Sequence, residues 1–83
     1  MRSRLRTGKT LTVVRWEFMR GKERMSCQVD RAAGTFAVIG LPYQKLQRAT
    51  VEVFGSAMAA LRRHAMLASD LRAAGWKLVE YTH

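Results

Sequence analysis

The chain has 83 residues and a formal net charge of +9, from 15 Lys and Arg against 6 Asp and Glu. This length predicts one domain with a modest core. One cysteine excludes an internal disulfide framework, and no run approaches the ~20 apolar residues of a membrane span. We therefore expect a cytoplasmic protein without a membrane partner.

The first nine residues differ from the rest of the chain. They carry Arg2, Arg4, Arg6 and Lys9 and show no apolar periodicity, so residues 1–9 are expected to form a disordered basic arm. A single α+β domain is expected over residues 10–83, which keep eleven basic and six acidic side chains. A basic chain is attracted to nucleic acid or to anionic surfaces. The alternative is that the charge only keeps a soluble protein apart from its neighbours.

Two segments alternate apolar and polar residues with the period of a half-buried strand, at residues 10–20 and 25–30. A turn at Gly21 separates them, and short loops join antiparallel neighbours. The segments therefore predict a β-hairpin. The residues expected on its inward face are Val14, Trp16, Phe18, Met25, Cys27 and Val29.

The middle of the chain is less regular. Residues 35–40, TFAVIG, predict a third strand whose nearly continuous apolar residues suit a central position. Residues 43–55 leave two alternatives open. The β-branched residues and Gly55 favour a short fourth strand at 50–54 after an irregular loop. The same segment could instead extend the following helix backward.

Residues 56–74 predict one long C-terminal helix, with Ser56 as N-cap and Gly75 as the left-handed residue that ends it. Its periodicity predicts an apolar face toward the sheet. The residues expected on this face are Ala57, Met58, Leu61, His64, Ala65, Ala68 and Leu71, with Arg62 and Arg63 pointing away. Residues 76–83 predict a short extended C-terminus, either a strand or a tail on the sheet.

These elements predict an α+β fold: an antiparallel β-meander of three to four strands packed by the long C-terminal helix. Three segments, CQVDRAAGTF, VEVF and ALRRHAMLASDLRAAGW, resemble a group of small bacterial proteins that carries no assigned activity. In topology, a four-stranded meander followed by a helix is similar to the single-stranded nucleic-acid-binding folds of the PUR and Whirly kind. That similarity implies a fold and no site residue.

The sequence offers little for catalysis. A thiol nucleophile needs a lowered pKa and a nearby base, and only His64 and His83 could serve Cys27. We expect Cys27 to be an inert buried thiol and His64 a satisfied core residue, so no catalytic residue and no enzyme are predicted. Zinc needs paired ligands, and no metal, cofactor or small-molecule ligand is expected. The alternative is a small enzyme around His64 or Cys27.

Basic side chains are the candidates for a partner, because a hairpin tip and a basic helix face can both follow a phosphate backbone. The candidate nucleic-acid-binding residues are Arg15, Arg20, Lys22, Arg24, Arg62 and Arg63. The first functional hypothesis is therefore a small binding or accessory protein with weak affinity for nucleic acid. The alternative is a protein-interaction module that forms a homodimer through the helix face or a sheet edge.

Overall fold

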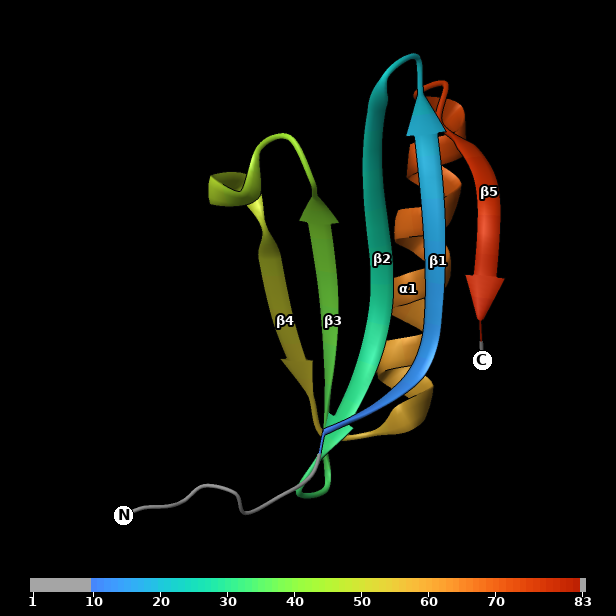
Figure 1. The fold of residues 1–83 in the computed structure, drawn as a ribbon. Coiled ribbons are helices and arrows are strands. Elements are labelled where there is room, and N and C mark those ends of the chain that lie inside the picture. The colour runs from blue at the N-terminus through green and yellow to red at the C-terminus, as the bar shows by residue number, and fades with distance from the viewer. Residues whose placement is uncertain (1–9, 83) are drawn as a thin grey trace.

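The computed structural model describes residues 10–82, so the basic arm expected at residues 1–9 lies outside the described residues. The described part is a five-stranded antiparallel sheet with one α-helix on one face (Figure 1). The elements are β1 (Leu11–Arg20), β2 (Glu23–Ala32), β3 (Thr35–Pro42), the 3-10 helix η2 (Leu46–Arg48), β4 (Thr50–Phe54), α1 (Ala57–Ala73) and β5 (Lys77–Thr82). The α+β class is therefore confirmed.

The strand order is β4-β3-β2-β1-β5, so α1 carries the chain from one edge of the sheet to the other. The fourth strand expected at 50–54 is confirmed as β4. The expected number of three to four strands is wrong, because the C-terminal segment is a fifth strand. It pairs with the second edge of β1, where Phe18 lies opposite Leu78 and Trp16 opposite Tyr81. A tail would have left the backbone groups of that edge unpaired.

The hydrophobic core lies between α1 and the sheet. Phe18 and Cys27 are buried together with Ala68. A second cluster joins Val29 and Val38 to Ala60. Alanine at the contact points brings the helix backbone close to the strands, so a short helix can seal the larger side chains of β1, β2 and β3.

Both ends of α1 are specified by local hydrogen bonds, as the sequence predicted. The Ser56 hydroxyl accepts from the backbone N–H of Ala59 at 3.1 Å. At the other end Gly75 has a φ of +94°, a conformation that glycine reaches at no steric cost. The Trp76 N–H then donates to the Leu71 carbonyl at 2.9 Å, which satisfies a carbonyl of the last turn.

The rotation of α1 differs from the expectation. Ala57, Met58, Leu61 and Ala65 were expected on the sheet, but all four are exposed, with Leu61 42% exposed. His64 and Ala68 are buried as expected, but the third buried residue is Ala60, so the buried face is rotated toward Ala60. His64 is buried because its Nε2 donates to the carbonyl oxygen of Cys27 at 2.9 Å. That bond satisfies the ring nitrogen of His64 inside the core.

The packing predicts a contrast between two alanines of α1. Ala68→Leu inserts three carbons beside Phe18 and should lower the free energy of unfolding by about 1–3 kcal/mol. Ala65→Leu is the matched control, because the same change on the exposed side should stay within about 0.5 kcal/mol. Urea unfolding followed by circular dichroism measures both. Equal effects would contradict the observed rotation of the helix.

Cys27 is a second test of this core. The residue is 1% exposed, and burial raises the pKa of its thiol to about 11. In the unfolded chain the thiol ionises near its ordinary value of 9.0. Between these two values the folded state holds a proton that the unfolded state has lost. The contribution of Cys27 to the free energy of unfolding is therefore fully present below pH 9 and falls as pH rises toward 11.

We expect the stability difference between the native chain and Cys27→Ala to shrink by about 1–1.5 kcal/mol from pH 8 to pH 10. Urea unfolding at both pH values measures it, and subtracting the variant removes the contribution of Lys and Tyr titration. A difference that stays constant across this range would mean that the native thiol is not protected from ionisation.

Candidate nucleic-acid interface

One end of the sheet brings together two segments that lie far apart in the sequence: the turn between β1 and β2, and the loop at residues 43–49. The Tyr43 N–H donates to the Arg24 carbonyl at 3.0 Å. The Gln44 side chain accepts from the Arg24 N–H at 3.0 Å and donates to the Lys22 carbonyl at 3.2 Å. Gln44 thus joins the loop to the turn, so the backbones of the two segments are held at a fixed position relative to each other.

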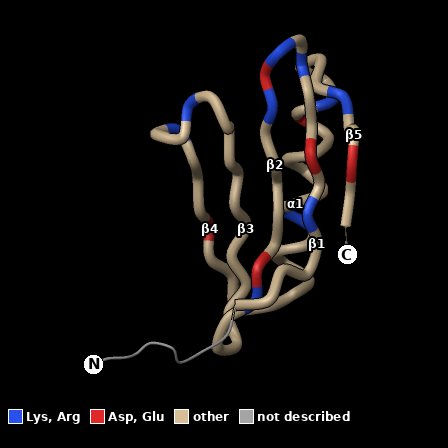
Figure 2. The backbone as a smooth tube through the Cα atoms, viewed as in Figure 1, with Lys and Arg blue, Asp and Glu red and all other residues tan. Residues whose placement is uncertain are grey.

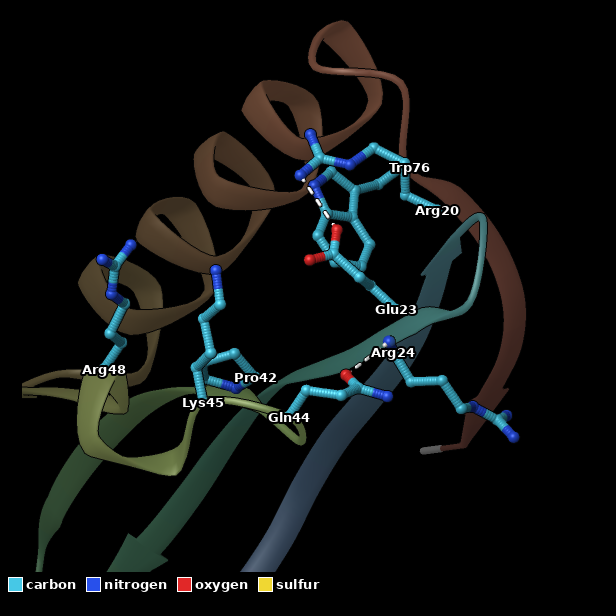
Figure 3. A pocket seen from close by; sticks show the side chains of 8 residues that line it. All are labelled: Arg20, Glu23, Arg24, Pro42, Gln44, Lys45, Arg48 and Trp76. Atoms are coloured by element: carbon cyan, nitrogen blue, oxygen red, sulfur yellow. Dashed lines mark hydrogen bonds and ion pairs between the residues drawn. The ribbon is translucent and has the colours of Figure 1, made fainter.

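A shallow hollow lies between this loop and the C-terminal end of α1 (Figure 3). Its volume of about 160 Å³ is below the roughly 300–1,000 Å³ of pockets that enclose small molecules. The charged and aromatic residues that line it are Arg20, Glu23, Arg24, Lys45, Arg48 and Trp76. The guanidinium of Arg24 points away from the hollow (Figure 3), so three cations and one carboxylate face it, and this balance favours an anionic group that belongs to a larger molecule.

Arg20 forms one wall of the hollow and is held from three sides. Its guanidinium donates to the Ala74 carbonyl at 3.1 Å and to the Glu23 carboxylate at 3.2 Å. The same group lies 4.6 Å from the centre of the Trp76 ring. A cation at the C-terminus of a helix is favoured by the helix dipole. Arg20 therefore links α1 to the β1–β2 turn, and the Glu23 carboxylate partly neutralises its charge.

Lys45 and Arg48 form the opposite wall, and both side chains rise from the loop toward the helix (Figure 3). Lys45 is the N-cap of η2 and Arg48 its last residue. Residues three apart are eclipsed in a 3-10 helix, so the two cations share one side. Within residues 10–82 neither side chain has a hydrogen bond or ion pair, and the same holds for Lys22.

Sequence reasoning missed Lys45 and Arg48. Their spacing of three was visible, but no periodic pattern assigned residues 43–49 to an element, so no common face could be derived. The signal that could have found them is the local charge alone: the 43–49 loop has two cations and no acidic residue. A basic loop of this kind stays in water, where its cations need no internal partner.

Two of the predicted residues lie on the sheet face opposite α1 and are bound internally. Glu17 pairs with Arg15 at 3.1 Å and with Arg24 at 3.7 Å. Arg15 also donates to the Tyr43 hydroxyl at 2.7 Å, and this hydrogen bond raises the pKa of Arg15 above its ordinary value. Arg15 is therefore held by side chains of this chain, whereas Arg24 has only one long ion pair.

The two arginines of α1 that were predicted to bind nucleic acid, Arg62 and Arg63, have different surroundings. Arg63 was expected to point away from the sheet, but its Nε donates to Glu52 of β4 at 2.7 Å. That bond raises the pKa of Arg63 above its ordinary value. Arg62 is exposed on the outer side of α1. The structure therefore gathers Arg20, Lys22 and Arg24 at one end of the sheet and leaves the other three candidates outside that group.

The candidate catalytic residues are core residues in this structure. The imidazole of His64 bonds the backbone of Cys27 rather than its thiol, and it meets the Trp16 ring edge-on at 5.1 Å between centroids. His83 lies outside the described residues. Within residues 10–82, no three His, Cys, Asp or Glu side chains come together in a way that could hold a metal ion.

In the part of the chain that the structure describes, α1 is neither long enough nor apolar enough to cross a membrane. Comparisons of the chain with protein-family models, with curated proteins and with solved structures gave no match.

Proposed function

We propose that the protein binds nucleic acid through the basic end, defined as Lys22, Arg24, Lys45 and Arg48. The observation that carries the proposal is the joining of two basic segments by Gln44. The backbones that carry the turn and loop cations are thereby held together, and three of these cations have no internal partner among the described residues. Cations held near one another in this way can contact phosphates of a bound strand.

The residue types support contacts to phosphate rather than to bases. Lysine offers a compact charge, and arginine offers paired donors that match a phosphate. Trp76 is the aromatic residue at the hollow, but Arg20 already lies over its ring. Base stacking therefore contributes little, and we expect binding that is weak, insensitive to sequence and strongly dependent on salt.

The expected result is binding of fluorescently labelled DNA and RNA at ~50 mM salt that is largely lost at ~200 mM. Lys45→Gln with Arg48→Gln should lower the affinity about tenfold at the lower salt and reduce the salt slope by about 2. Fluorescence anisotropy on single-stranded and duplex probes measures both quantities.

The matched control is Arg31→Gln with Arg62→Gln. It removes the same charge from two exposed residues outside the hollow, and it should change the affinity at most about twofold if the basic end is the site. Equal losses of affinity in the two double variants would mean that binding depends on net charge alone and not on the basic end. Replacing Arg2, Arg4, Arg6 and Lys9 by Gln measures how much of the affinity comes from the first nine residues. Tight binding to anionic vesicles without binding to nucleic acid would assign the basic end to lipid.

A further inference from the structure

β4 forms one edge of the sheet, and no other strand of the described chain pairs with its outer side (Figure 1). Every second residue of such a strand directs an N–H and a C=O away from the sheet, where another extended chain can pair with them. The inner side of β4 is regular, because its ladder with β3 runs through five residue pairs in continuous register. The outer side is therefore a straight row of donors and acceptors.

The opposite edge of the sheet, formed by β5, is protected. The register of β5 with β1 shifts between Glu17 and Phe18, and such irregularities twist an edge away from new partners. β5 also carries Lys77 and Glu80, and charged side chains discourage pairing between edges. β4 contains one charge, Glu52, which is bonded to Arg63 of the helix. The sheet thus has one blocked edge and one open edge.

The open edge adjoins an apolar patch on the face opposite α1. Val51 and Val53 are 61% and 63% exposed. They lie opposite Ile39 and Ala37 of β3, which extend the patch inward. Figure 2 shows β3 and β4 almost free of charged residues, while the loop that joins them carries the basic residues Lys45 and Arg48. Exposed valines beside unpaired backbone groups favour addition of a strand.

We propose that a second copy of this chain occupies this edge, with its β4 antiparallel to β4 of the first. The sequence Val51-Glu52-Val53 reads the same in both directions. A register centred on Glu52 therefore places Val51 of each copy opposite Val53 of the other, on the same face. Strand pairing of this kind is self-complementary about a two-fold axis, and cross-strand pairs of β-branched residues stabilise it. The result is one sheet of ten strands.

The charges of the chain fit this arrangement. β4 begins two residues after Arg48 of the basic end, and antiparallel pairing reverses the second copy. The two basic ends then lie at opposite ends of the dimer, where their repulsion is weakest. The two Glu52 side chains meet near the axis. Each keeps its 2.7 Å hydrogen bond to its own Arg63, which offsets the like charges.

Sedimentation velocity from about 1 µM to about 500 µM tests the state of the full-length chain, and we expect a reversible monomer–dimer equilibrium. Val53→Lys places a charge at the edge and should raise the dissociation constant of the dimer by at least about tenfold. Val79→Lys is the control, because Val79 is also an exposed valine, 48% accessible, but lies on the blocked edge. It should leave the equilibrium unchanged.

A cross-linking experiment reads the register directly and requires no loss of folding. Val51→Cys and Val53→Cys proteins, mixed and oxidised, should form disulfide-linked heterodimers in excess of either homodimer, because directly opposed residues approach within disulfide range. Cys27 is buried and should not interfere. A native chain that stays monomeric at the highest concentration would overturn the proposal. A dimer that Val53→Lys leaves intact would also overturn it. So would a dimer in which the disulfide-linked heterodimer is not in excess of either homodimer. Lys45→Gln with Arg48→Gln should leave dimerisation unchanged, which separates this result from nucleic-acid binding.

Discussion

The close contact between α1 and the centre of the sheet is the constraint on which the rest of the structure depends. One helix of 17 residues must cover five strands. It does so by presenting Ala60 and Ala68 to the large residues of the core, and His64 on the same face bonds the Cys27 carbonyl. The helix covers one face of the sheet and reaches both edge strands through Phe54 and Leu78, whereas the outer backbone edge of β4 and the loop at residues 43–49 lie outside this core.

The basic end follows from where the helix stops. Gly75 ends α1 beside the β1–β2 turn, and Arg20 joins the two by bonding the Ala74 carbonyl. The loop at residues 43–49 lies beyond this contact and is ordered by hydrogen bonds of Gln44 instead of by a hydrophobic core. A loop held in this way can stay hydrated, so its lysine and arginine keep their charge without a desolvation cost. The same positions inside the core would have required carboxylate partners.

Local signals in the sequence predicted the parts of this fold that local physics decides. The Ser56 cap, the Gly75 ending and the strand at 50–54 each depend on residues within one turn or one strand. The rotation of α1 could not be predicted, because apolar residues such as Leu61 occur on both sides of the helix. The internal partners of the arginines could not be predicted from the sequence either. Arg63 and Glu52 belong to different elements, and Arg15 and Tyr43 are 28 positions apart. Only the assembled sheet shows which arginines are engaged and which are free.

The β3–β4 hairpin separates two kinds of contact that would interfere with each other if mixed. Its strands carry one charged residue, Glu52, whereas the loop between them carries Lys45 and Arg48. Backbone pairing along β4 is short-ranged and depends on close approach, and a cation at the edge would oppose it. Phosphate binding acts over about a Debye length and benefits from exposed cations. In the proposed arrangement, placing the cations in the loop and the valines in the strand keeps strand pairing with a second copy and binding of a polyanion from weakening each other.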